Sequence, residues 1–230
     1  MIIETMGRRR TVKNYTKSLL HFDGIDGSTT FTDEKGNIIN RTGSVYIDTL
    51  VSKFGGASGI FNEGNVNNGY LTLPGSVDLT IGAQSFTVDF WANCTVIDTG
   101  QNIFSYGIPT NLTNGFRLGF LLTHTVEFYA YNQYIDKSNL DFWGSWVHIA
   151  IVGNGAADGS RTIKLYVNGV LAGTYTGNYN YSQQNIGIGY VVGAPTGAKL
   201  CGYMDELRIS IGIQRWTSDF TPPTSAYTLD

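Results

Sequence analysis

The chain has 230 residues, of which 42% are hydrophobic and only 14% are charged, so it is long enough to bury a large core. Its 29 glycines and 14 tyrosines suit short strands and tight turns rather than helices. The net charge of −3 argues against a general nucleic-acid-binding protein, and we expect neither a secretory signal nor a membrane span.

The first 17 residues are predicted to form a basic arm. Five basic residues against the single acidic Glu4 give this arm a charge of about +4, so the remaining chain carries about −7. Such an arm can bind phosphates or an acidic neighbouring subunit, or it can remain a solvated tail. The sequence therefore predicts a basic N-terminal arm over residues 1–17 and one β-sandwich domain over residues 18–230.

From residue 18 onward, short apolar segments alternate with clusters of Gly, Asn, Asp and Pro, as strands joined by turns do. The predicted strands are, in chain order, Ser18–Phe22, Ser44–Ile47, Gly59–Phe61, Tyr70–Leu73, Ser85–Cys94, Gly115–Leu122, Val126–Tyr131, Trp146–Val152, Thr162–Val167, Val170–Tyr175, Ile186–Tyr190 and Gly202–Ile211. We expect loops at Asn132–Gly144 and Thr176–Asn185. At most one or two helical turns are expected, and the region near Val77–Ile81 is the strongest candidate.

Two segments locate the core. Phe86, Val88 and Phe90 alternate onto one face of their strand, while residues 146–152 are apolar on both faces and therefore predict a strand in the middle of a sheet. Between two further strands, Asn168–Gly169 supplies the two positive-φ residues of a type I′ hairpin turn. These features together predict an antiparallel all-β fold.

Cysteine and histidine chemistry is sparse. Cys94 and Cys201 both lie in apolar, strand-like surroundings, which predicts two buried thiols rather than a disulfide or a zinc site. His21, His124 and His148 lie in or beside strands at spacings unlike those of metal motifs. We expect each histidine to be hydrogen-bonded or partly exposed rather than to bind a metal.

Several segments, in this order, resemble the laminin-G-like, concanavalin A-like jelly-roll family. The resembling stretches begin at Leu19 (LLHFDG), Lys53 (KFG), Gly59 (GIF), Tyr70 (YLTLP), Ser85 (SFTVDFW), Trp146 (WVHIA), Leu165 (LYVNG), Gly202 (GYMDELRIS), Arg215 (RW) and Phe220 (FTPP). Together they span about residues 18–223. The resemblance implies a concanavalin A-like jelly roll, in a family that includes carbohydrate-binding modules, adhesion domains, pentraxin-like proteins and domains of phage tail and capsid proteins.

The basic arm, the Asn/Tyr/Gly-rich composition and the closing FTPPT stretch look most like a phage virion domain. We therefore expect a non-catalytic attachment protein that contacts glycans, located in the virion or, alternatively, at a cell surface or outside the cell. The alternative is a structural capsid-decoration or tail-fibre subunit in a homo-oligomer or larger assembly, with the arm on an acidic neighbour. Neither a membrane nor a specific nucleic acid is expected as a partner.

Enzyme activity is not expected. Related jelly-roll glycosidases place carboxylates on one strand as Glu-x-Asp-x-x-Glu, and this sequence lacks that pattern, with Asp89 and Glu127 each alone on a strand. Asp205 and Glu206 are adjacent, so we expect them on opposite faces, unable to supply the two carboxylates roughly 5–10 Å apart that glycosidases use. A glycan-cleaving enzyme with carboxylates from separate loops is a second alternative.

The resemblance also implies a structural calcium site. Family members often hold one Ca²⁺ with a carboxylate at the end of the first strand and another from the last strand, and Asp23 and Asp205 occupy the matching positions. Calcium needs roughly six to eight oxygen ligands, so nearby carbonyls would complete the set. The alternatives are a turn hydrogen bond at Asp23 and, for Asp205, either pairing with Arg208 or the capping of a loop.

Aromatic side chains mark the candidate glycan contacts, because sugar rings stack on aromatic faces. The candidates are Tyr129, Tyr131, Tyr134 and Trp143 around one loop, and Tyr179, Tyr181 and Gln183 around another. Tyr129 and Tyr131 are two positions apart and share one face of their strand. The alternative for each aromatic residue is plain packing or a subunit contact. Trp91, Trp146 and Trp216 are assigned to the core or its edge.

Overall fold

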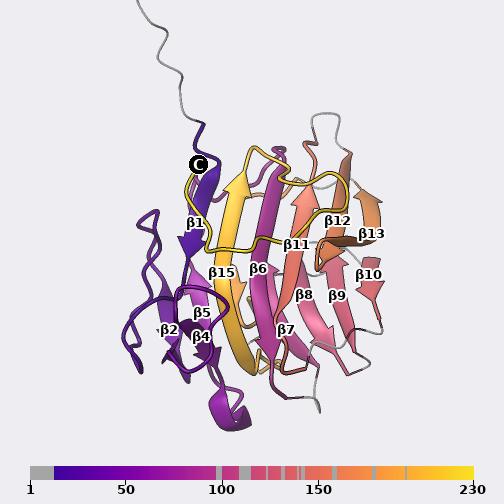
Figure 1. The fold of residues 1–230 in the computed structure, drawn as a ribbon. Helices are drawn as coiled ribbons and strands as arrows, with labels where there is room; N and C mark the ends of the chain where they lie inside the picture. Colours follow the sequence, from indigo (N-terminus) through magenta and orange to yellow (C-terminus); the bar gives the residue numbers. More distant parts are fainter. Residues whose placement is uncertain are drawn as a thin grey trace, which may run out of the picture.

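The computed structural model describes residues 13–96, 100–108, 115–122, 124–130, 133–138, 140, 143–156, 160–177, 180–194 and 196–230. Two antiparallel sheets pack face to face (Figure 1), which confirms the predicted all-β sandwich. Sheet A has the strand order β13-β12-β11-β6-β15-β4-β3, with β1 paired to β15, and sheet B has the order β10-β9-β8-β7-β14-β5-β2.

The strands of sheet A are β1 (Thr16–Leu20), β3 (Val45–Asp48), β4 (Ser58–Phe61), β6 (Phe86–Cys94), β11 (Val147–Gly153), β12 (Arg161–Val167), β13 (Val170–Gly177) and β15 (Gly202–Ile211). Those of sheet B are β2 (Asn40–Thr42), β5 (Tyr70–Leu73), β7 (Gln101–Tyr106), β8 (Phe116–Leu121), β9 (Thr125–Ala130), β10 (Gln133–Lys137) and β14 (Ile186–Ile188). No helix in the described part of the chain is long and apolar enough to cross a membrane.

The core lies between the two sheets and is rich in aromatic rings. Phe86, Val88 and Phe90 are all buried in it, as the alternation predicts. Phe90 stacks on Phe104 of sheet B with ring centroids 6.2 Å apart, and Phe86 stacks on Phe116 at 5.8 Å. Because each sheet turns alternate side chains inward, the remaining residues of the same strands point to the two outer faces of the sandwich.

The sequence located most strands within two residues, and the first strand begins at Thr16, two positions before the predicted boundary of the arm. The Asn168–Gly169 turn is confirmed, with φ values of 49° and 78°. Cys94 and Cys201 are buried thiols, as expected. β11 lies between β6 and β12 and is buried along its whole length, which confirms its predicted central position.

The connections differ from the predictions in three respects. The expected loop Asn132–Gly144 contains strand β10, and β2 and β7 were not predicted. Near the expected helical turn, residues 76–80 form two successive hydrogen-bonded turns, with Leu79 N donating to the Ser76 carbonyl and Thr80 N to the Val77 carbonyl, but no assigned helix. Among the residues that the structure describes, the only helical element is the 3₁₀ turn Glu63–Asn65.

The C-terminal segment, residues 212–230, closes the outer face of sheet A. In Figure 1 this segment, drawn in yellow, runs across the strands of sheet A and ends beside β1. Trp216 and Phe220 stack at 4.0 Å and lie over His148. Tyr227 N donates to Glu206 Oε2 at 2.7 Å, which ties the segment to β15. The chain therefore covers one of its own two outer faces.

A buried polar cluster lies beneath this segment. Arg208 donates to both carboxylate oxygens of Asp89, at 3.1 and 2.8 Å, and both residues are buried. His148 Nε2 lies 3.0 Å from the hydroxyl of Tyr227. Burial opposes ionisation of Asp89, but the Arg208 charge and hydrogen bonds from His148 and Arg208 hold its pKa below the ordinary value. Asp89 is thus part of a structural ion pair, not an isolated carboxylate.

Candidate ligand-binding face

The outer face of sheet B carries a row of polar and aromatic side chains. Ser105, Arg117, Tyr129 and Tyr134 are direct cross-strand neighbours on β7, β8, β9 and β10. Their immediate neighbours along each strand, such as Phe116 and Phe128, are buried in the core. Alternation therefore turns the whole row outward, on the face opposite the core.

Tyr129 and Tyr134 form an aromatic platform at one end of this row, which we call the tyrosine platform. Their ring centroids are 4.9 Å apart, and Tyr134 is 57% exposed. The guanidinium carbon of Arg117 lies 5.1 Å from the Tyr129 ring centroid, within cation–π range. The two rings are tilted by 45° to each other, and together with the arginine they give a partly exposed surface with apolar faces and hydrogen-bond donors.

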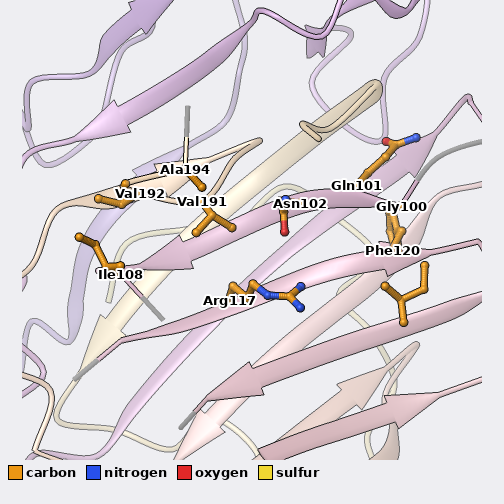
Figure 2. Close-up of a pocket in the computed structure, with 11 residues that line it drawn as sticks. Gly100, Gln101, Asn102, Ile108, Arg117, Phe120, Val191, Val192 and Ala194 are labelled. Atoms are coloured by element: carbon orange, nitrogen blue, oxygen red, sulfur yellow. The ribbon is translucent and has the colours of Figure 1, made fainter. Parts of the chain in front are cut away.

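A cavity of about 500 Å³ adjoins the platform above β7 and β8. It is lined by Gly100, Gln101, Asn102, Ile108, Arg117, Phe120, Leu121, Val191, Val192, Gly193 and Ala194. Figure 2 shows Arg117 and Asn102 within this space, with Val191, Val192 and Ala194 along one side. A volume of this order falls within the range of small-molecule sites.

One wall of the cavity is the loop of residues 189–194, held by Ser105. The Ser105 hydroxyl donates to the Tyr190 carbonyl at 3.2 Å and accepts from Val192 N at 3.0 Å. The loop passes close over β14, where a Cβ at Gly187 would lie 2.7 Å from the Tyr190 carbonyl oxygen. Glycine at position 187 therefore allows the loop to cross the sheet and form the wall.

Arg117, which lines the cavity, forms an ion pair with Glu127 of the next strand. Arg117 Nη2 lies 2.5 Å from Glu127 Oε1, and Glu127 is buried. Asp136 of β10 stands directly opposite Glu127. Burial raises the pKa of Glu127, the Arg117 charge and hydrogen bond oppose this, and the Asp136 charge adds to the increase. The sequence suggested that Glu127 is an isolated carboxylate. In the structure it faces a second carboxylate, Asp136, on the unpredicted strand β10.

The structure brings together only some of the predicted contact residues. Tyr129 and Tyr134 share the platform, whereas Tyr131 and Tyr179 lie outside the described residues. Trp143 contacts His124 instead, with its Nε1 donating to His124 Nε2 at 3.3 Å. His124 immediately precedes β9 and lies five residues before Tyr129, which is about 16 Å along an extended chain at roughly 3.3 Å per residue.

In the second predicted group, Tyr181 does not lie on the surface. Tyr181 has no exposed area and packs edge-on against Phe86 and Phe116 in the core, so its ring cannot stack on a ligand in this structure. Gln183 is exposed and donates to the Gly75 carbonyl at 3.0 Å, near the end of β5. In sheet B, β5 is separated from β9 by β14, β7 and β8.

A family model described as the concanavalin A-like lectin/glucanases superfamily, of the third laminin-G type, matches residues 64–211, more than half of the chain. The chain belongs to this superfamily. None of the curated proteins matches the sequence.

Solved structures of this architecture resemble the chain at low sequence identity. The receptor-binding domain of botulinum neurotoxin type G superposes with a TM-score of 0.60 at 14% identity, covering 87% of this chain and 48% of that one. Domain 4 of AbnA, a GH43 extracellular arabinanase from Geobacillus stearothermophilus solved with arabinotriose, gives 0.56 at 16%, covering 87% and 94%. The chain spans about half the length of the neurotoxin domains it matches. At sequence identities this low, the structural similarity shows a shared fold and nothing more.

A third similar structure is from botulinum neurotoxin type C, whose cell entry is dependent upon interaction with two ganglioside molecules. It superposes with a TM-score of 0.58 at 15% identity, covering 85% of this chain and 47% of that one.

The calcium positions implied by the superfamily lie together on sheet A, around residues 51–56. Asp205 Oδ2 accepts from Lys53 N at 2.8 Å and Phe54 N at 3.0 Å, whereas its buried Oδ1 has no hydrogen-bond partner among the described residues. Asp23 lies against Gly55, where a Cβ would approach its Oδ1 to 2.2 Å. Burial raises the pKa of Asp205 to about 7, and the Asp23 charge contributes to that shift.

The two carboxylates suit a cation in charge, and Asp205 Oδ1 is free to bind one. Two side chains alone supply too few oxygen ligands for calcium. No cluster of three His, Cys, Asp or Glu side chains placed to hold a metal occurs in the described part of the chain. Asp23 and Asp205 would therefore hold a calcium ion only with backbone carbonyls and water as further ligands. Of the alternatives for Asp205, pairing with Arg208 is excluded because Arg208 binds Asp89. The capping of a loop is confirmed by the hydrogen bonds from Lys53 N and Phe54 N.

Asp205 and Glu206 do not point to opposite faces, which corrects the sequence-based expectation. The pairing of β15 with β6 shifts register between Asp205 and Arg208, and Glu206 has a φ of 55°, so a β-bulge inserts one extra residue here. Glu206 lies 2.8 Å from His21 Nδ1 and accepts from Tyr227 N, beneath the C-terminal segment. It is therefore engaged in holding that segment rather than facing a cleft.

Arg117 and Asn102 were missed by sequence reasoning, and Glu127 was considered only as an isolated carboxylate. The alternation of Arg117 with Phe116 and Leu118 could have placed it on an outer face. Its pairing with Glu127 depends on the register between β8 and β9, which no local pattern specifies.

Proposed function

We propose that this chain is a non-catalytic glycan-binding domain that uses the outer face of sheet B. The proposal rests on one observation: the cavity containing Arg117 and Asn102 adjoins the tyrosine platform. A sugar presents apolar ring faces that pack on aromatic rings and hydroxyls that pair with amide and guanidinium groups. This face offers both kinds of group within one surface, and the outer face of sheet A is covered by residues 212–230.

The fold comparison supports this proposal. The arabinanase domain was solved with a bound oligosaccharide, and the type C neurotoxin interacts with gangliosides, which carry glycans. Both share the sandwich architecture with this chain. The proposal carries the ligand class over from these proteins, while the residues that would make the contacts come from this chain alone.

We propose a non-catalytic role because of the positions of the two facing carboxylates, Glu127 and Asp136. Glu127 is buried in an ion pair with Arg117, and Asp136 is exposed beside it. A glycosidase needs one carboxyl group that donates a proton to the scissile oxygen and a second that attacks or activates water. Neither Glu127 nor Asp136 is among the residues that line the cavity, so a ligand there would not meet such a pair of carboxyl groups. Release of reducing sugar that is abolished by Glu127→Gln would instead favour the glycan-cleaving alternative.

Binding is tested by screening the full chain on a glycan array and then titrating the strongest glycan by calorimetry against the wild type and Arg117→Ala. We expect about a tenfold or greater loss of affinity, because a hydrogen bond from a charged donor contributes about 1.5–3 kcal/mol. Lys164→Ala on sheet A, also a cation-to-alanine change, is the matched control and should bind as the wild type does. Equal affinity of Arg117→Ala and wild type would overturn the proposed site.

We further propose that the domain acts as an attachment protein of a virion, where an oligomer would present several copies of this face. The support is the basic N-terminal arm, whose charge of about +4 contrasts with about −7 for the rest of the chain. The structural-subunit alternative predicts a defined oligomer without glycan binding. Sedimentation of the full chain and of a variant lacking residues 1–12, each with and without the array glycan, separates the two roles.

We also propose that Asp23 and Asp205 hold a structural Ca²⁺, which when bound would neutralise the two carboxylates and link the first and last strands. Thermal unfolding with added calcium and with a chelator tests this. An ion present at about a hundredfold excess over its Kd increases the free energy of unfolding of the protein by about 2.7 kcal/mol. Calcium should therefore raise the Tm of the wild type but not that of Asp205→Asn, and an identical Tm in calcium and chelator would contradict the site.

A further inference from the structure

The two sides of the cavity on sheet B differ in chemistry. The side formed by Ile108, Val191 and Val192 is apolar, and Leu121 continues this wall at the other end. The opposite side presents Asn102 and Arg117, which Figure 2 shows projecting into the space between the strands and the loop of residues 189–194. A ligand that fills this cavity must therefore place an apolar group and a hydrogen-bonding group close together.

Asn102 presents a defined acceptor to the cavity. Its Nδ2 donates to the Ala198 carbonyl at 2.7 Å, and its backbone N donates to the same carbonyl at 3.3 Å. Because the amide nitrogen is used, the orientation of the side chain is fixed and Oδ1 remains as the acceptor. No described residue donates a hydrogen bond to that oxygen. The cavity therefore has one oriented acceptor beside the donors of Arg117.

The charge of Arg117 is already compensated. Its guanidinium is 2.5 Å from Glu127 Oε1, and Asp136 stands directly across from Glu127 on β10. One carboxylate is therefore bound to the guanidinium, and a second stands across from the first on the neighbouring strand. A ligand carboxylate or sulfate would meet a compensated arginine and like charges, which disfavours acidic saccharides.

We infer that the cavity selects an uncharged 2-acetamido sugar over both plain hexoses and acidic sugars. The acetamido methyl packs on the apolar wall, its N–H donates to Asn102 Oδ1, and its carbonyl accepts from Arg117. This inference rests on the proposed glycan-binding function and names the substrate class of the same site. A hexose with a hydroxyl at this position leaves the apolar wall unfilled and lacks the amide.

The experiment is an amide NMR titration of the full chain with methyl glycosides in three matched pairs. The probes are N-acetylglucosamine and N-acetylgalactosamine, glucose and galactose, and glucuronic and galacturonic acid. We expect at least one acetamido sugar to bind about tenfold or more tightly than its plain hexose, because a lost apolar contact of this size is worth about 10–200-fold. The two acids should bind most weakly.

The outcomes separate the inference from the proposed function. Plain hexoses that bind as tightly as the acetamido sugars would overturn the inference and leave glycan binding in place. Preferential binding of the acids would overturn the argument about compensated charge. Absence of binding by any of these sugars, together with a glycan array without a signal, would overturn both.

Two variants test the proposed determinants. Glu127→Gln keeps the shape of the side chain but removes its charge, and the ratio of acidic-sugar to acetamido-sugar affinity should rise about tenfold. Asp136→Asn is the matched control, because Asp136 is exposed and does not contact Arg117, so its effect on that ratio should be several times smaller. Val192→Ser, at a half-buried loop position, should lower the preference for acetamido over plain hexose.

Thermal unfolding of each variant verifies that it is folded at the titration temperature. An unchanged ratio in folded Glu127→Gln would contradict the role of the ion pair in selectivity. If Glu127→Gln does not fold, the Val192→Ser result and the wild-type sugar series decide the inference by themselves.

Discussion

The two outer faces of this sandwich contain similar residues in opposite settings. On sheet A, Arg208 is bound to Asp89, and the ring of Tyr227 lies 4.1 Å from its guanidinium carbon. On sheet B, Arg117 is bound to Glu127 on one side and faces the cavity on the other. The difference comes from residues 212–230, which cover sheet A only. An arginine–carboxylate pair is thus structural where the chain closes over it and available to a ligand where it does not.

The largest expected effect comes from the covered face. In Asp89→Asn, the buried Arg208 loses its charged partner, and breaking a buried pair in this way costs about 3–5 kcal/mol. Chemical denaturation should show this loss in the free energy of unfolding. Arg117→Ala on the open face is the comparison and should cost less, because Arg117 is partly exposed and Glu127, whose pKa burial already raises, can be neutralised by a proton. Equal losses in the two variants would contradict the contrast between the faces.

The cover itself should contribute the next largest effect. Phe220 stacks on Trp216 and contacts Tyr166, and we expect Phe220→Ala to cost about 2 kcal/mol because the ring is only half-buried. Denaturation followed by tryptophan fluorescence measures both the stability and the altered surroundings of Trp216. Glycan affinity should not change. A parallel loss of affinity would indicate that the ligand binds to the outer face of sheet A rather than to that of sheet B.

Acid should weaken the covered face in a defined pH range. Because the folded-state pKa of Asp89 lies below the unfolded value of about 3.9, its ionised form stabilises the fold above about pH 4. This contribution is lost as the pH falls through the folded-state pKa. The free energy of unfolding of the wild type should therefore decrease more steeply below pH 4 than that of Asp89→Asn. Parallel curves for the two proteins would show that Asp89 does not contribute.

The smallest effect on stability is expected on the open face. Tyr134→Ala removes an exposed ring from the platform, so stability should change by less than about 0.5 kcal/mol. Glycan affinity should fall about five- to tenfold, since a ring contact is worth about 0.5–1.5 kcal/mol beyond its buried area. Tyr203→Ala, on sheet A, is the matched control in the calorimetric titration. A loss of stability without a loss of affinity would assign Tyr134 to packing.

Most of the fold was predictable because the core strands follow a period of two residues. β7 was missed where that period breaks: its pairing with β8 shifts register between Asn102 and Phe104, so that Ile103 and Phe104 are both buried. β10 was missed because it is an edge strand with exposed polar residues and only Ile135 buried. The same kind of irregularity at Glu206 defeated the argument from alternating faces.

The site was predictable only in part. Tyr129 and Tyr134 were named from their residue type, but their contact depends on the pairing of β9 with β10. Tyr181 looks equally suitable in the sequence and is buried, because residue type does not report which tyrosines the core requires. Arg117 and Asn102 become a site only when the loop of residues 189–194 crosses the sheet beside them, which is a long-range contact.

The central claim is that ligands bind to the outer face of sheet B. Its most direct test is the map of backbone amide chemical-shift changes when the strongest glycan from the array is titrated into the full chain. The account predicts changes centred on Asn102, Arg117, Tyr134 and Val192, with none beyond the noise in residues 212–230. Changes centred on residues 212–230 or on the strands beneath them would contradict it.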